Sequence, residues 1–191
     1  MIAIIDYGAG NANSVKNALD YLGEESVITS DPKKILNADK VIFPGVGAFG
    51  DAMNELKKRK LDLTIKKVIE SKKPFLGICI GLQVLFEGSE ESPRLKGLGI
   101  LKGRVIRFTK GKIPQIGWNK ISSKSIGDGY AYFVNSYYAV PEDKKIIEST
   151  SDYYTKFTAA IKRGNVFATQ FHLEKSGKFG LEILRRWLNA G

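Results

Sequence analysis

One stretch of the sequence indicates the fold most clearly: Pro74-Phe75-Leu76-Gly77-Ile78-Cys79-Ile80-Gly81. The apolar run Pro74–Ile78 predicts a buried strand, and a helical pattern begins with Gly81–Phe86. Cys79 therefore stands at a sharp turn from a strand into a helix. The glycines on either side fit a nucleophile elbow, because side chains at those two positions would collide with neighbouring strands. The stretch predicts an α/β fold with a candidate nucleophile at a strand-to-helix turn.

The first half of the chain continues this alternation of strands and helices. The predicted strands and helices, in chain order, are Ile2–Asp6, 15–22, Ser26–Thr29, Lys40–Pro44 and 61–71. Glycine-rich turns, Gly8-Ala9-Gly10 and Gly45–Gly50, follow two of the strands. An alternation of this kind predicts a mainly parallel sheet that is covered by helices on both faces.

The second half is richer in aromatic and β-branched residues, which favour strands. The strand-like segments are Gly103–Phe108, Tyr130–Val140, Ile146–Thr150, Thr155–Lys162 and Val166–Phe171. A final helix is predicted from about Ser176, with this residue as its N-cap. We expect a single α/β domain over residues 1–191, of flavodoxin-like type. Its central mixed sheet is mostly parallel, is flanked by helices and is extended by antiparallel strands.

Composition narrows the chemistry, because the 191 residues include one Cys and one His. A single Cys excludes an internal disulfide, and the usual structural zinc sites need four Cys or His ligands. Cys79 and His172 are therefore the only pair available for thiol–imidazole chemistry. We expect neither a metal nor a cofactor.

The formal net charge of +10 admits nucleic acid or an acidic partner. The basic residues are scattered in short groups such as Lys57–Lys60, without interleaved aromatics, so a solvated surface is the favoured interpretation. No apolar run reaches the ~18 residues needed to span a bilayer. The start of the chain, Met1–Asp6, lacks the basic region of a signal peptide. We expect a cytoplasmic protein that binds neither nucleic acid nor membrane.

Three segments carry candidate catalytic groups. The helix after Cys79 favours a thiolate through its dipole, and the backbone N–H of Ile80 points to where an oxyanion would develop. His172 and Glu174 follow a predicted strand, and residues two apart in an extended segment share a face, so the carboxylate can hold the imidazole tautomer. The turn Pro44–Gly47 offers a second backbone donor. Each feature alone has a plainer structural interpretation; together they favour a thiol–imidazole–carboxylate triad.

Motifs along the whole chain carry a resemblance to a known family. They are Asp6–Asn11 (including Tyr7-Gly8-Ala9-Gly10), Pro44–Gly50, Phe75–Gln83, Leu85–Glu91, Ile113–Asn119, Tyr132–Tyr137 and Ala168–Ser176. With these motifs the sequence resembles class I (triad) glutamine amidotransferases. Within that class it is most similar to the glutaminase subunits of imidazole glycerol phosphate synthases, which act in histidine biosynthesis. The elbow and the His-x-Glu motif specify only the superfamily. The Pro44–Gly50, Gly117–Asn119 and Tyr132–Tyr137 blocks, in this order and length, specify the subunit.

The resemblance implies that glutamine is hydrolysed to glutamate and ammonia through a Cys79 thioester, with His172 as general base and acid and Glu174 as its orienter. It also implies oxyanion donors at the backbone N–H groups of Val46 and Ile80. The residues that match substrate-binding positions are Gly47, Gln83, Glu91, Asn135 and Ser136.

The implied partner is a (β/α)8-barrel cyclase subunit of imidazole glycerol phosphate synthase, joined in a heterodimer. The ammonia passes to this cyclase, which makes imidazole glycerol phosphate and AICAR. Asn11, Trp118 and Lys175 match positions expected near the partner.

The sequence departs from the family pattern at three positions. Gln115 and Asn135 stand where the family usually has His, and Leu173 stands where it has Pro. Amide side chains still donate and accept hydrogen bonds but cannot carry a proton near neutral pH. Without a proline after His172, contacts from elsewhere in the fold must hold the imidazole. We expect the triad to survive these changes.

Three other interpretations compete with this one. A dinucleotide-binding enzyme is suggested by Gly8-x-Gly10, but the third position of that fingerprint is Asn13, so the motif is incomplete. Another class I glutaminase, such as that of pyridoxal phosphate synthesis, would share the triad but not the Gly117–Asn119 and Tyr132–Tyr137 blocks. A catalytically weakened scaffold subunit would follow if the departures from the family disable turnover.

Overall fold

The computed structural model describes residues 1–9 and 11–190, and in this part of the chain nine strands form one sheet. The order of strands across the sheet is β2-β1-β3-β4-β11-β10-β9-β6-β7. A separate antiparallel pair joins β5 and β8. Gly10, in a predicted glycine-rich turn, lies outside the described residues. The strands are β1 (Ile2–Ile5), β2 (Ser26–Thr29), β3 (Lys40–Phe43), β4 (Phe75–Ile78), β5 (Gly103–Arg107), β6 (Gln115–Ser123), β7 (Gly129–Asn135), β8 (Tyr137–Pro141), β9 (Ile147–Asp152), β10 (Lys156–Arg163) and β11 (Val166–Thr169).

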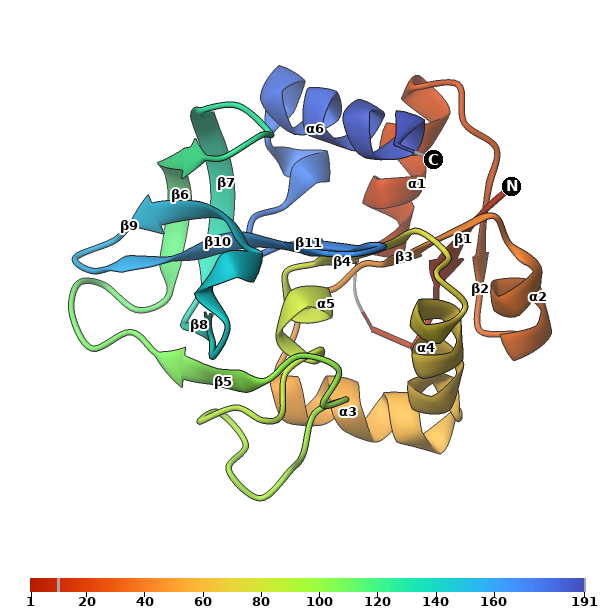
Figure 1. Cartoon of the computed structure of the whole chain (residues 1–191), viewed down its shortest axis with the longest axis horizontal. Coiled ribbons are helices and arrows are strands. Elements are labelled where there is room, and N and C mark those ends of the chain that lie inside the picture. Colours follow the sequence, from red (N-terminus) through yellow and green to blue (C-terminus); the bar gives the residue numbers. More distant parts are fainter. Residues whose placement is uncertain (10, 191) are drawn as a thin grey trace.

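Strand direction changes at β11. The strands β2, β1, β3, β4 and β11 run parallel to their neighbours in this series. From β11 through β10, β9 and β6 to β7 every pairing is antiparallel. These pairings confirm the predicted mixed sheet, and β4 lies beside β11 near the change of direction (Figure 1). This adjacency brings the segment after β4 close to the segment after β11.

Helices cover both faces of the parallel half of the sheet, as predicted. In Figure 1, α1 and α6 lie on one face and α3 and α4 on the other. Two apolar cores fill the layers, one under α1 and α6 and the other under α2, α3 and α4. The helices are α1 (Ala12–Tyr21), α2 (Pro32–Asn37), α3 (Phe49–Lys58), α4 (Leu61–Glu70), α5 (Ile80–Gln83) and α6 (Gly177–Asn189), with short 3-10 helices η1 (Lys144–Ile146) and η2 (Leu173–Lys175).

Two predictions in the second half of the chain need correction. The predicted strand Tyr130–Val140 is two strands, because the chain leaves β7 at Ser136 and crosses to pair with β5. The strand β6 was not predicted. Ile121 is buried, but so is the polar Gln115, whereas Ile116 and Trp118 are exposed. The first half of β6 thus reverses the pattern that identifies a half-buried strand.

Helix boundaries also differ from the sequence pattern. The helix predicted over Gly81–Phe86 begins one residue earlier, at Ile80, and ends at Gln83. The helices α2 and α3 were not predicted, although Asp31 accepts a capping bond from Lys33 N in the usual way at the start of α2. The elements that position the candidate nucleophile are nevertheless those that were predicted.

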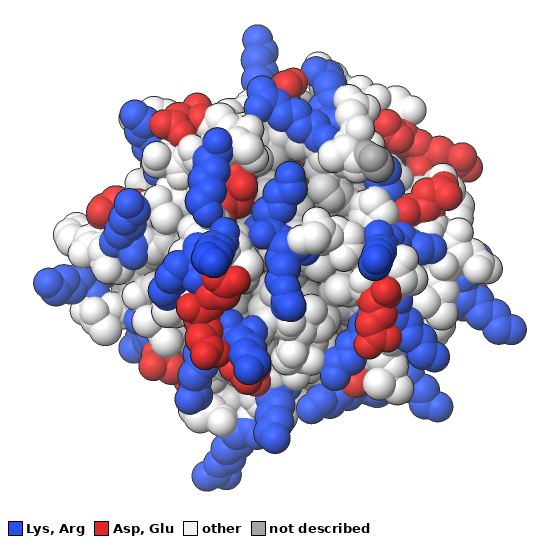
Figure 2. Space-filling view, in the orientation of Figure 1, with Lys and Arg blue, Asp and Glu red and all other residues white. Residues whose placement is uncertain are grey.

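Charged side chains are spread widely over the surface. Figure 2 shows Lys and Arg over all parts of one face, with Asp and Glu between them. This distribution fits the interpretation of a solvated surface. No helix within residues 1–9 and 11–190 is both long and apolar enough to cross a bilayer.

Candidate active site

The elbow between β4 and α5 holds Cys79 in an unusual conformation, with φ 54° and ψ −103°. Its backbone N–H donates to Thr169 O of β11 at 2.7 Å, which ties the turn to the neighbouring strand. A Cβ atom on Gly77 would lie 2.5 Å from Gly81 O, and one on Gly81 would lie 2.3 Å from Phe43 O. Both glycines are therefore required by close backbone contacts, which confirms the predicted elbow geometry.

The helix after the elbow is shorter than the sequence suggested. Since α5 spans Ile80–Gln83, its dipole is that of a single turn and stabilises a thiolate less than a long helix would. The N–H of Ile80 is the first of the helix and has no acceptor within it. This N–H remains a candidate oxyanion donor beside Cys79.

His172 and Glu174 form a buried pair. Nδ1 of His172 lies 2.8 Å from Oε1 of Glu174, and the two side chains are 1% and 2% exposed. A carboxylate can only accept, so Nδ1 carries a proton and Nε2 is the nitrogen left to face Cys79. The predicted pairing is correct, but its backbone is not extended: Glu174 lies in the 3-10 helix η2.

Hydrogen bonds to Tyr132 and Ser176 hold the backbone of His172. Its N–H donates to Tyr132 O of β7 at 3.0 Å, and the Ser176 hydroxyl donates to His172 O at 2.6 Å. The same hydroxyl accepts from Tyr132 N at 2.9 Å. Ser176 occupies the N-cap position of α6, but its side chain makes no capping bond to that helix, contrary to the prediction. These contacts replace the restraint that a proline at Leu173 would give.

The surroundings of His172 favour its charged form. Burial of the ring lowers its pKa, but Cys79 and Glu174 outweigh burial and raise the pKa to about 10. Nε2 has no hydrogen-bond partner of good geometry among the described residues. The sulfur of Cys79 therefore raises the pKa of the ring although the two groups form no well-aligned hydrogen bond. The raised pKa favours the charged form of the ring beside the sulfur.

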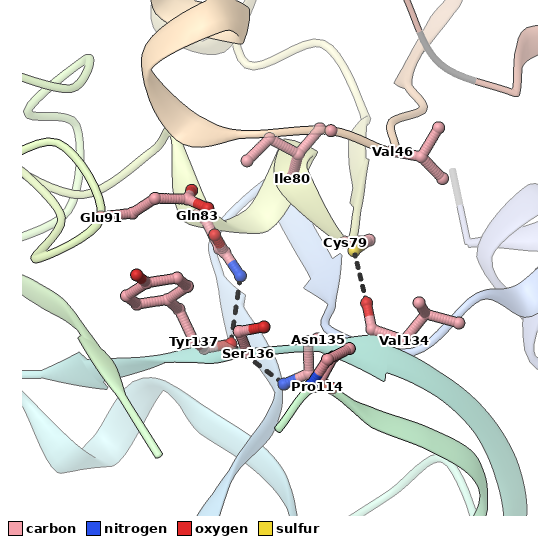
Figure 3. A pocket seen from close by; sticks show the side chains of 11 residues that line it. Val46, Cys79, Ile80, Gln83, Glu91, Pro114, Val134, Asn135, Ser136 and Tyr137 are labelled. Atoms are coloured by element: carbon pink, nitrogen blue, oxygen red, sulfur yellow. Dashed lines mark hydrogen bonds between the residues drawn. The ribbon is translucent and has the colours of Figure 1, made fainter. Parts of the chain in front are cut away.

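A pocket of about 220 Å³ opens at the elbow. Every residue predicted to bind substrate lines it, as do the nucleophile and both predicted oxyanion residues (Figure 3). His172 and Glu174 are buried and do not line it. The lining residues are Val46, Gly47, Cys79, Ile80, Gln83, Glu91, Pro114, Val134, Asn135, Ser136 and Tyr137. The sequence assigned no role to Pro114, Val134 or Tyr137, which local motifs alone do not distinguish.

Polar groups around the pocket are already partly paired. Oε2 of Glu91 accepts from Phe49 N at 2.6 Å, at the start of α3. The Tyr7 hydroxyl donates to Val46 O at 3.1 Å, which fixes the orientation of that carbonyl. Val46 itself is 38% exposed at the pocket rim. Within the described part of the chain, no group of three His, Cys, Asp or Glu side chains is placed to hold a metal ion.

The residues predicted near the partner lie outside the pocket. Trp118 is 54% exposed on β6 and its ring stacks edge-on against Tyr132. Lys175 is exposed beside the buried His172 segment, and partly exposed Asn11 precedes α1, where its Oδ1 accepts from Ser14. Trp118 and Lys175 therefore present side chains to the surface: Trp118 packs beside Tyr132, which bonds to the His172 backbone, and Lys175 follows Glu174 in the chain.

Comparisons with known proteins identify the family. The family model of class I glutamine amidotransferases matches residues 3–190. A solved structure described as a glutamine amidotransferase superposes with a TM-score of 0.83 at 18% identity, covering 99% of this chain and 98% of the other. PurLQS from Thermotoga maritima gives 0.80 at 20% identity, covering 98% and 97%. At such identities the structural likeness concerns the fold alone, but with the family match the chain belongs to the class I glutamine amidotransferases.

Curated relatives narrow the family further. The chain is 44% identical to imidazole glycerol phosphate synthase subunit HisH 1 of Methanococcus maripaludis, over 98% of both chains. It is 46% identical to the HisH subunit of Rhodopirellula baltica, over 100% of this chain and 98% of that one. It also spans 34% of the chloroplastic imidazole glycerol phosphate synthase hisHF of Arabidopsis thaliana, at 46% identity over 99% of this chain. Within the class I glutamine amidotransferases, this chain therefore belongs with the HisH subunits of imidazole glycerol phosphate synthase.

Proposed function

We propose that this protein is a glutaminase that hydrolyses glutamine to glutamate and ammonia at Cys79, as a subunit of an imidazole glycerol phosphate synthase in histidine biosynthesis. The observation that carries the proposal is the arrangement of Cys79, which lines the pocket, with the buried pair of His172 and Glu174. A charged imidazole beside the only cysteine is the arrangement that thiolate chemistry needs.

The proposed reaction begins when the Cys79 thiolate attacks the side-chain amide carbon of glutamine. Backbone N–H groups of Val46 and Ile80 stabilise the oxyanion of the tetrahedral intermediate. His172, charged at neutral pH, protonates the departing ammonia and leaves a thioester on Cys79. The neutral imidazole then takes a proton from water, which hydrolyses the thioester to glutamate. Glu174 keeps the ring in the required tautomer throughout.

The pocket offers complementary groups for the other end of glutamine. The free carboxylate oxygen of Glu91 and the amide oxygen of Gln83 suit an ammonium group, because both only accept hydrogen bonds in these orientations. The backbone and hydroxyl of Ser136 and the side chain of Asn135 line the opposite wall. We propose that these residues and Gly47 hold the substrate while Cys79 attacks.

The proposed partner is the (β/α)8-barrel cyclase subunit of imidazole glycerol phosphate synthase, bound as a heterodimer. The names of the relatives support this partner, since they are subunits of that synthase and the Arabidopsis protein is named hisHF. We place the contact at the exposed surface around Trp118, Lys175 and Asn11. Ammonia released at Cys79 would pass to the cyclase, which makes imidazole glycerol phosphate and AICAR.

Glutamate formation with and without the cyclase subunit and its ligand tests the proposal. We expect activity in the complex, and its loss in Cys79→Ser with folding and partner binding retained. A glutamine-analogue alkylator should label Cys79. A folded wild-type complex that makes no glutamate would instead favour a scaffold subunit, and activity that does not depend on the cyclase but on another synthase would favour another class I glutaminase.

A further inference from the structure

We infer that Gln170 is a further positioning residue of the site: its side-chain amide donates an N–H to the sulfur of Cys79 and connects that sulfur to the substrate pocket. The inference rests on the proposed function, because it concerns the same thiol. No sequence motif distinguishes Gln170 as a site residue.

Position and burial place the Gln170 amide firmly beside the nucleophile. Gln170 directly follows β11, and its backbone N–H donates to Ala159 O of β10 at 2.8 Å. The preceding residue, Thr169, accepts from the N–H of Cys79 at 2.7 Å. The side chain of Gln170 is fully buried, and its Nε2 lies 3.6 Å from Cys79 Sγ, within hydrogen-bond distance for sulfur.

A backbone carbonyl fixes which end of the Gln170 amide faces the sulfur. Nε2 of Gln83 donates to Tyr137 O at 3.2 Å and to Oε1 of Gln170 at 3.1 Å. A carbonyl oxygen can only accept, so the Gln83 amide cannot be reversed without losing this bond. The oxygen of Gln170 must then face Gln83, and its NH2 group must face Cys79.

The same carbonyl extends the network to the far wall of the pocket. Nδ2 of Asn135 donates to Tyr137 O at 2.9 Å, so two amides meet at this one oxygen (Figure 3). Asn135, the Tyr137 carbonyl, Gln83 and Gln170 form an amide relay that ends on Cys79. The relay contains no titratable group, so its donor at the sulfur stays in place at every working pH.

The relay favours the thiolate over the thiol. An N–H donor gains strength when its acceptor becomes charged. The thiol form can donate only weakly, to Val134 O at 3.9 Å. Gln170 and the imidazolium of His172 therefore both lower the energy of the charged sulfur, from two sides. The relay also occupies both N–H groups of Gln83 and leaves its oxygen for the ligand.

The test measures the pH dependence of iodoacetamide alkylation of Cys79 in the full-length protein, where the single cysteine makes the site unambiguous. In Gln170→Leu we expect the pH of half-maximal alkylation rate to rise by about one unit, which corresponds to about a tenfold loss of thiolate. The glutaminase rate of the complex at neutral pH should fall by about the same factor. Tyr7 and His172, the titratable groups that act on Cys79, are unchanged in the variant.

Gln115→Leu is the matched control, because Gln115 is equally buried and its amide makes no hydrogen bond in the described structure. Its alkylation profile should match the wild type. If Gln170→Leu does not fold, Gln170→Met takes its place. It keeps the length of the side chain and removes the N–H donor without adding a charge, so the profile should shift in the same direction.

A wild-type profile in a folded Gln170 variant would overturn the inference, as would an equal shift in Gln115→Leu. The proposed function fails separately, if the wild-type complex forms no glutamate, and that result leaves the alkylation comparison intact.

Discussion

Replacing Gly81 by Ala tests whether close packing at the elbow fixes the nucleophile. The new Cβ would lie 2.3 Å from Phe43 O, about 1.1 Å inside the 3.4 Å at which ordinary contact begins. The obstacle is a backbone oxygen at the end of β3, which cannot rotate away as a side chain could. Either β3 or the elbow must therefore move by about 1 Å. Overpacking of this kind costs about 3 kcal/mol, and at about 2–4 °C per kcal/mol the Tm should fall by about 6–12 °C.

Activity should suffer more than stability, since a displacement of about 1 Å at a reacting group can cost about 100-fold in rate. Thermal unfolding and glutamate formation in the complex measure the two effects. Gly88→Ala is the matched control, because the nearest atom to its Cβ is Leu95 O at an ordinary 3.6 Å. A Gly81→Ala protein with the Tm and rate of Gly88→Ala would refute the reasoning.

Three further predictions concern the imidazole. Ser176→Ala removes the hydroxyl shared by Tyr132 N and His172 O, so urea unfolding should show a loss of about 2 kcal/mol; an unchanged midpoint would contradict this. Cys79→Ala removes the sulfur that raises the pKa of His172, so the ring should titrate below about 10. NMR of the single His measures this, and the argument fails if the titration is unmoved. Because the folded pKa lies above the ordinary 6.5, the folded state binds the extra proton between the two values. The unfolding free energy should thus be highest below about pH 6.5 and fall toward about pH 10, and a flat denaturation midpoint across this range would count against it.

The strands of the parallel half were predictable because their signals are local, whereas α2 and α3 between them were not predicted. Apolar runs and helical spacing identify β1, β2, β3 and β4 from neighbouring residues alone. The break between β7 and β8 has no comparable signal. It arises because Ser136 stands where the chain leaves one sheet for another, and its carbonyl accepts from Phe108 N at 3.0 Å. Such a break depends on a partner strand whose paired residues lie at least 30 positions away, and hydrophobic periodicity carries no information about so distant a partner.

The triad was predictable because short motifs mark its residues. The contacts that support it were not predictable, because they involve residues distant in sequence. Cys79 is marked by its two glycines, and Glu174 lies only two residues from His172, so short motifs reveal them. The support of the His172 backbone depends on Tyr132 of β7, which is distant in sequence. Tyr132 O accepts from His172 N, and Tyr132 N donates to the Ser176 hydroxyl, which in turn donates to His172 O. This explains how Leu173 can replace a proline, since a local restraint on φ is redundant where two long-range bonds already fix the chain.

The amide relay at Cys79 likewise depends on contacts between segments that are distant in sequence. The relay joins three separate segments, those of Gln83, Tyr137 and Gln170. They meet because β4 pairs with β11 and because strand β7 ends at Asn135. Because position 135 carries an amide, none of the relay side chains, Asn135, Gln83 and Gln170, changes its protonation state with pH. His172 is therefore the one titratable side chain among these donors to the sulfur.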